Sequence, residues 1–236
     1  MKTIRLNFFQ MLAYMRRDRM LFAACLAPLL AGFLFRFAIP FLEAAVTDRF
    51  HVPAIIVPYY ALIDIFFAML SPAMFCFVSA MVSLEETDEK TAAYLFVTPL
   101  GRNGYLAARL GIPSVTAFLV TSILMPVFKL TSLSAVDIIL LAAGGTLQGI
   151  IISLLILTFS SNKLEGMAVT KLSTLMICGA AIPFFIKHDV QYVLFPLPSF
   201  WIGKTICENA SLYMLPAFIL SITWICILLK RYLRKI

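Results

Sequence analysis

Hydrophobic residues occur along the chain in six runs, each long enough to cross a bilayer as a helix. A spanning helix needs about 20 predominantly apolar residues. The predicted spans cover approximately residues 20–42, 59–83, 106–128, 135–159, 167–186 and 211–229. The connections between the runs are short and leave no room for a separate soluble domain. The pattern therefore predicts an all-α integral membrane protein, with six transmembrane helices in a single domain over residues 1–236.

The segment before the first run, residues 1–19, alternates large apolar residues with lysine and arginine. This pattern is typical of an amphipathic helix that lies in the headgroup layer of the membrane. The apolar run that follows is longer than the about 7–15 residues of a signal peptide. We therefore expect an N-terminal interfacial helix followed by a first span that is retained in the protein.

The basic residues indicate the orientation of the spans. Fourteen of them fall on the side of the N-terminus, namely Lys2, Arg5, Arg16, Arg17, Arg19, Lys90, Arg102, Arg109, Lys163, Lys171, Lys230, Arg231, Arg234 and Lys235. Four fall on the other side, namely Arg49, Lys129, Lys187 and Lys204. Cytoplasmic connections carry an excess of lysine and arginine, so both termini are predicted to be cytoplasmic. The same distribution accounts for the net charge of +7 and argues against nucleic-acid binding.

The composition and motifs give no support for an enzyme. Hydrophobic residues make up 62% of the chain and charged residues 13%, against about 45–50% and about 25% in soluble domains. Gly203-Lys204-Thr205 resembles the end of a phosphate-binding loop, but the position that requires the first glycine is Pro198. The sequence contains no HExxH or GxSxG motif, so we expect no catalytic residue and no metal site. Gly144, Gly145 and Gly149 lie within a span and are better explained by close helix packing.

Two ionisable residues fall within the predicted membrane region. Arg36 is near the outer end of the first span, and Asp64 is near the outer start of the second. Charges in the membrane usually pair or face a polar cavity. The two residues therefore form an ion pair or contribute to a substrate path; alternatively, Arg36 extends to the outer headgroups.

One long polar segment, predicted to be cytoplasmic, separates the second and third spans. Residues 84–98 are predicted to form a helix that ends before Pro99. Acidic residues occupy its first turn, and four large apolar residues follow near its end, Tyr94, Leu95, Phe96 and Val97, which we call the apolar tip. A solvated loop seldom exposes four consecutive large apolar residues. A partner groove or the membrane surface is therefore expected to cover the tip.

The string "EETDEKTAAYLFVTPLGRNGYLAARL", residues 85–110, resembles the cytoplasmic coupling segment of permeases in the type-2 ATP-binding-cassette (ABC) export family. The matching residues are Glu85, Glu86, Glu89, Thr91, Leu95, Thr98, Pro99, Leu100 and Tyr105. The chain departs from the pattern at Lys90, where glycine is common, and at Ala93, where an acid is common. The six spans, the basic N-terminus and residues 160–172 are also similar to small permeases of this family, some of which export drugs.

The resemblance implies that this chain is the permease subunit of an exporter in the bacterial inner membrane. ATP would be bound by a separate ABC ATP-binding subunit, so this chain needs no cofactor of its own. The residues expected to contact that subunit are Glu85, Glu86, Asp88, Glu89, Tyr94, Leu95, Phe96 and, more weakly, Glu165. A second permease subunit, identical or similar, would complete the pathway along the first, second and fifth spans, in contact with membrane lipid.

A different class of function fits the same polar segment. A membrane scaffold or assembly factor would recruit a soluble cytoplasmic partner through this helix without transporting anything. The apolar spans do not select a cargo, since an amphipathic drug, a lipid-linked sugar and a hydrophobic peptide all suit them.

Overall fold

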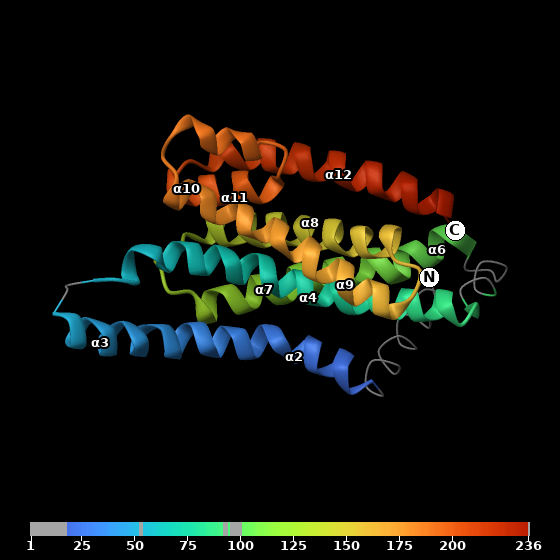
Figure 1. Cartoon of the computed structure of the whole chain (residues 1–236), viewed down its shortest axis with the longest axis horizontal. Helices are drawn as coiled ribbons and strands as arrows, with labels where there is room; N and C mark the ends of the chain where they lie inside the picture. The colour runs from blue at the N-terminus through green and yellow to red at the C-terminus, as the bar shows by residue number, and fades with distance from the viewer. Residues whose placement is uncertain (1–17, 52–53, 92–93, 95–100, 236) are drawn as a thin grey trace.

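The computed structural model describes residues 18–51, 54–91, 94 and 101–235. The described residues are helical, without a strand, and they include six segments long and apolar enough to cross a membrane (Figure 1). The predicted fold class is therefore confirmed. The predicted interfacial helix, residues 1–19, lies almost entirely outside the described residues.

The first three spans follow one another with alternating direction. The first comprises α2 (Arg19–Phe33), the π-helical turn η1 (Leu34–Ala38) and α3 (Ile39–Phe50). The second comprises η2 (Val57–Tyr59) and α4 (Tyr60–Asp88). The third comprises α6 (Gly101–Leu106), the π-helical turn η3 (Ala107–Gly111) and α7 (Ile112–Phe128).

The second half of the chain adds three spans and a short helix pair. The fourth span is α8 (Ala135–Phe159), and the fifth comprises α9 (Lys163–Thr174), η4 (Leu175–Ala181) and α10 (Ile182–Phe185). η5 (Asp189–Leu194) and α11 (Pro198–Cys207) precede the sixth span, which comprises η6 (Ser211–Tyr213) and α12 (Met214–Lys235).

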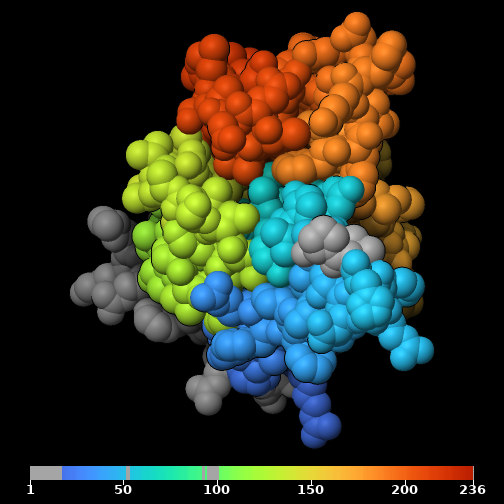
Figure 2. Space-filling view, turned by 90° about the vertical axis from the view of Figure 1, so that its left-hand side faces the viewer, coloured from blue at the N-terminus to red at the C-terminus, as the bar shows by residue number. Residues whose placement is uncertain are grey.

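The two ends of the bundle differ in what they carry. We use the name terminal end for the end of the bundle at which α2 begins and at which α4 and α12 end, with Asp18, Asp88 and Lys235 (Figure 1). α11 and the end of α3 lie at the opposite end, where α3 projects furthest (Figure 1). Figure 2 looks onto this opposite end and shows the start of the second span between the first span and the orange segment around α11.

The centre of the bundle is the contact between α4 and α8. Of the most apolar stretch of each span, 72% is buried in the second and 67% in the fourth, but only 11% in the first and 22% in the sixth. A Cβ atom on Gly145 would lie 2.1 Å from the carbonyl oxygen of Ala68, and one on Gly149 would lie 3.1 Å from the backbone of Pro72. Glycine at these positions lets the two backbones approach closely, as the sequence predicts.

The outer spans present apolar surface. Phe33, Phe37 and Phe41 of the first span and Ile219 and Ile222 of the sixth are more than half exposed. Such side chains suit lipid or a neighbouring membrane subunit, since lipid tails are as apolar as they are. The first span contacts the third where Gly32 and Phe33 pack on the ring of Phe128.

Candidate functional site

The acidic residues of the polar segment lie at the end of the second span and do not begin a new helix. α4 continues without a break through Asp88, so the structure differs from the predicted start at Leu84. The hydroxyl of Thr87 donates to the Ser83 carbonyl at 2.8 Å, within this last stretch of helix. Carboxylates near a helix C-terminus are disfavoured by the helix dipole. The end of α4 therefore requires cationic neighbours.

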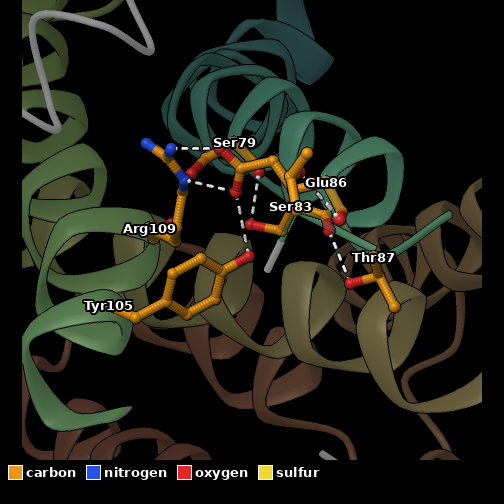
Figure 3. A network of polar contacts seen from close by, with 7 residues as sticks. Ser79, Ser83, Glu86, Thr87, Tyr105 and Arg109 are labelled. Atoms are coloured by element: carbon orange, nitrogen blue, oxygen red, sulfur yellow. Dashed lines mark hydrogen bonds and ion pairs between the residues drawn. The ribbon is translucent and has the colours of Figure 1, made fainter. Parts of the chain in front are cut away.

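Glu86 receives such a neighbour from the third span. Arg109 donates from Nε to the Glu86 carboxylate at 2.9 Å and forms a second, very short contact through Nη2 (Figure 3). The Tyr105 hydroxyl donates to the same carboxylate at 3.0 Å. The Arg109 side chain is 3% exposed and the Glu86 side chain 19%. A bidentate, largely buried pair of this kind fixes the end of α4 to the start of the third span.

The backbone of the third span is irregular where it carries Arg109. Residues 107–111 form the π-helical turn η3, and Ser79 of α4 donates a hydrogen bond to the Arg109 carbonyl. π-helical turns are rare and are frequent at functional sites. The turn places both the side chain and the carbonyl of Arg109 against α4. From the sequence, Arg109 counts only toward the orientation of the spans, and its pair with Glu86 is not predicted. Arg109 is the fourth residue of a predicted span, however, and an arginine at such a position is itself a sign of a buried ion pair.

Glu85 is bound on a different side of α4, by the fifth span. Lys163, the first residue of α9, donates to Glu85 at 3.0 Å and to Asp18 at 2.6 Å. Asp18 also caps α2 by accepting from the Met20 and Leu21 amides. The hydrogen bond from Lys163 holds the pKa of the Asp18 carboxyl below its usual range. Lys163 thus joins the first, second and fifth spans, a link that the sequence did not predict.

Two further contacts at the terminal end involve helix termini. Glu165 accepts from the Ser161 amide at 2.7 Å, while Asn162 caps α9 by accepting from the Glu165 amide. Lys235, at the end of α12, donates to the Leu157, Thr158 and Ser160 carbonyls at the end of α8. A lysine at a helix C-terminus is favourable for the dipole. The fourth and sixth spans are therefore also joined here.

The remaining predicted contact residues lie beyond these pairs. Asp88, Glu89 and Lys90 are exposed, and Tyr94 is 73% exposed. Leu95 and Phe96 lie outside the described residues. The structure thus separates the acidic cluster into an inner part, Glu85 and Glu86, bound within the chain, and an exposed part.

Lys90 ends this helix in an unusual backbone conformation. Its φ is +60°, in the left-handed region, directly after the α4 cap residue Glu89. Glycine is strongly favoured at this position because it has no Cβ to clash. The resemblance leads us to expect glycine at this position, and the backbone here has the conformation that glycine adopts most easily.

Arg36 and Asp64 contact the same loop and make no ion pair with each other among the described salt bridges. Arg36 Nη1 donates to the Lys129 carbonyl at 2.9 Å. Asp64 accepts from the Leu130 amide at 2.8 Å and from the Thr131 amide at 2.9 Å. The Lys129 carbonyl and Leu130 amide belong to one peptide group. The two charges therefore hold the connection between the third and fourth spans from opposite sides, at the end opposite the terminal end.

A buried lysine lies near this opposite end, in the glycine-lysine-threonine stretch of α11. Lys204 is 2% exposed, and its ammonium lies 4.3 Å from the centre of the Tyr192 ring and 4.9 Å from that of Tyr213. It also contacts Glu208 at 3.4 Å. Burial lowers the pKa of Lys204, but the hydrogen bond to Tyr192 and the Glu208 charge outweigh it and raise the pKa above its ordinary value. The lysine of this stretch therefore packs within the chain, against two tyrosine rings and Glu208.

Within the described part of the chain, no group of three or more histidine, cysteine, aspartate or glutamate residues is placed to hold a metal ion. The polar contacts at the terminal end join helices to one another. The arrangement suits a mechanical role, in which a force on the exposed end of α4 reaches the other spans.

The chain resembles known proteins over most of its length. It matches a family model described as "Fluoroquinolones export permease protein Rv2686c-like" over residues 11–230. Two relatives from Mycobacterium tuberculosis are each 28% identical over 154 residues: fluoroquinolones export permease protein MT2760 of strain CDC 1551 / Oshkosh and fluoroquinolones export permease protein Rv2686c of strain ATCC 25618 / H37Rv. The similar region covers 63% of this chain and 60% of each relative. No solved structure matches the chain significantly.

The family match covers the first five spans and most of the sixth, and an export permease family agrees with the six membrane-spanning helices described above. The chain belongs to the Rv2686c-like family of fluoroquinolones export permease proteins and is a multi-pass membrane protein.

Proposed function

We propose that this permease is the membrane subunit of an ATP-driven exporter and that a separate ATP-binding subunit docks at the exposed end of α4. The proposal rests mainly on one observation. The exposed residues Asp88 and Glu89 lie at the end of a helix that Glu85 and Glu86 join, through Arg109 and Lys163, to three other spans, and the exposed Tyr94 follows them in the sequence. The terminal end would then face the cytoplasm, in the bacterial inner membrane, with both termini on that side.

The proposed docking surface at the end of α4 combines acidic and apolar side chains. Asp88 and Glu89 stand at the C-terminus of a long helix, where the helix dipole disfavours them and a cation is favourable. We therefore expect basic groups on the partner, beside an apolar recess for Tyr94, Leu95 and Phe96. Glu165, exposed in the first turn of α9 at the same end of the bundle, is the weaker contact. Glu85 and Glu86 would border the contact and would act mainly through the ion pairs that they already make.

The same contacts would transmit movement from the docking site to the other spans. When ATP closes the partner subunits, the docked end of α4, from Pro72 to Asp88, moves as a rigid element. Arg109 passes this movement to the third span, and Lys163 passes it to the first and fifth. ATP is bound by the partner, and this chain supplies the lever and the membrane path.

The path itself would require a second permease subunit, either a copy of this chain or a similar one. The first span is the least buried of the six, and its exposed phenylalanines offer an apolar face to such a neighbour or to lipid. The relatives' names specify fluoroquinolones, so an amphipathic drug of this class is the cargo that we propose. Arg36 and Asp64 would stabilise the connection over residues 129–134 and have no part in the path.

The proposal is tested by reconstitution. The permease should be purified with its ATP-binding partner, inserted into liposomes, and assayed for ATP-dependent movement of a fluoroquinolone by the fluorescence of the quinolone ring. We expect transport only when both subunits and ATP are present. A complex that assembles and hydrolyses ATP without moving this or any other amphipathic compound would indicate the scaffold function instead.

A further inference from the structure

The middle of the bundle contains a polar side chain without a visible role. Gln148 of α8 is 0% exposed, and both its amide nitrogen and its amide oxygen lack a hydrogen-bond partner among the described residues. A buried amide in this state is costly, because the bilayer core offers no water to satisfy it. A leucine at this position would avoid that cost. The amide therefore requires an explanation beyond packing.

The position of Gln148 on α8 places it at a junction of helices. Gly145 and Gly149 face α4, since a Cβ on either would meet the backbone of Ala68 or Pro72. Gly144 faces Ile202 of α11 and Met214 of α12. At about 100° per residue, Gln148 lies about 60° from Gly145 and about 40° from Gly144, in the angle between these two faces. Its amide thus belongs to the junction of α4, α8 and the α11–α12 pair.

A second polar group lies at the same junction. Pro72 has no backbone N–H, so the Ala68 carbonyl, four residues earlier in α4, lacks its usual intrahelical donor. That carbonyl lies where a side chain on Gly145 would be, against α8. The junction therefore holds an α4 carbonyl that lacks its usual donor and an amide from α8. No acidic or basic residue occurs in α4 from residue 65 to 84 or in α8 from residue 138 to 159.

We infer that this junction binds a neutral hydrogen-bonding group of the cargo, such as an amide, a carbonyl or a hydroxyl, when α4 moves away from α8. The inference rests on the proposed function. Pro72 is a weak point in α4, because a helix bends most easily where a hydrogen bond of its ladder is missing. Movement at Asp88 would bend α4 there and separate its backbone from Gly145 and Gly149. Gln148 and the Ala68 carbonyl would then be accessible together.

The test uses variants in which stability and transport are expected to change in opposite directions. Gln148→Leu in the reconstituted complex should raise the midpoint of thermal unfolding by about 2–4 °C, because it removes an unsatisfied amide. It should lower fluoroquinolone transport about fivefold or more, the effect of losing one hydrogen bond to cargo. Ser153→Ala is the matched control. It removes a hydroxyl of α8 that is equally buried and without a partner, about 140° away from Gln148, and should leave transport unchanged.

Pro72→Ala probes the movement separately. It supplies the missing N–H to the Ala68 carbonyl and should reduce transport per ATP hydrolysed without preventing assembly. Normal transport by Gln148→Leu would overturn the inference, and so would a lower unfolding midpoint, which would indicate that the amide is already bonded in the resting state. If the wild-type complex moves no cargo at all, the proposed function fails first, and the inference fails with it.

Discussion

Glu86 and Arg109 come from the facing ends of two consecutive spans and form a bidentate ion pair that is almost closed to solvent. The pair lies immediately before the segment that we propose as the docking site. Its neighbour Glu85 is bound by Lys163 on another side of the same helix. Two adjacent acidic residues therefore connect the end of α4 to most of the bundle. The following expectations derive from this arrangement and from the two other charged sites.

Breaking the central pair is expected to destabilise the protein more than removing it. Arg109→Met leaves the Glu86 carboxylate without its cation and should cost about 3 kcal/mol of unfolding free energy, the low end of the range for buried pairs, because Glu86 is 19% exposed. The double variant Glu86→Gln with Arg109→Met should recover at least half of this loss. The free energies come from denaturant unfolding in detergent. Equal loss in the single and the double variant would show that Arg109 acts through packing alone.

Lys163 is expected to contribute to stability through two ion pairs at once, with Asp18 and with Glu85. Its side chain is 27% exposed and those of Asp18 and Glu85 are 23% and 24% exposed, so each pair should contribute about 0.5–1 kcal/mol. Lys163→Met should therefore cost about as much as Asp18→Asn and Glu85→Gln together. In the Lys163→Met background, Asp18→Asn should cost less than in the wild type, where it also loses the Lys163 pair. Additive effects of these two substitutions would contradict the shared-lysine arrangement.

Substitution of Lys90 by glycine is expected to stabilise the folded protein. Because its φ is +60°, Lys90→Gly relieves a strained backbone and should raise the unfolding free energy by about 0.5–1 kcal/mol. Lys90→Val has the opposite expectation, since a β-branched residue is least tolerant of this conformation. Thermal unfolding of the three proteins in detergent ranks them directly. If the Lys90→Val protein is as stable as the Lys90→Gly protein, residue 90 does not adopt the left-handed conformation.

The buried Lys204 predicts a dependence of stability on alkaline pH. Its pKa is raised in the folded protein, so its contribution is complete below the unfolded value of about 10.4 and is lost as pH rises through the folded value. Lys204→Met keeps the apolar stem but loses the cation–π contacts with Tyr192 and Tyr213, at a cost of about 1–2 kcal/mol at neutral pH. The difference in unfolding midpoint between the two proteins should shrink above about pH 10.4. A constant difference across this range would exclude the charge as its cause.

Much of the fold follows from the sequence because the bilayer limits the possible structures. Six apolar runs of spanning length could only become helices, and close packing at Gly145 and Gly149 followed from their small size. Helix ends were less predictable. α4 extends five residues beyond the predicted end at Ser83, because polar residues that leave the hydrocarbon remain good helix formers.

The contacts of the site were largely beyond sequence reasoning. Asp18 and Lys163 are 145 positions apart, and no local pattern relates them. The segment 84–98 was identified by its polarity and its apolar tip, but the division between bound Glu85 and Glu86 and exposed Asp88 depends on which face of α4 meets Arg109 and Lys163. Similarly, Arg36 and Asp64 were placed at a common depth, whereas their shared partner is a backbone peptide, which carries no sequence signal.

The central claim is that the ATP-binding subunit contacts the exposed end of α4, and site-specific photocrosslinking tests it most directly. A photoreactive amino acid should be introduced at Asp88 in the assembled, transport-active complex, and at Glu208 as a control, since Glu208 is 44% exposed at the opposite end of the bundle. We expect the ATP-binding subunit to be captured from position 88 and not from position 208. Capture from position 208, or from neither position in a complex that still hydrolyses ATP and exports its cargo, would contradict the account.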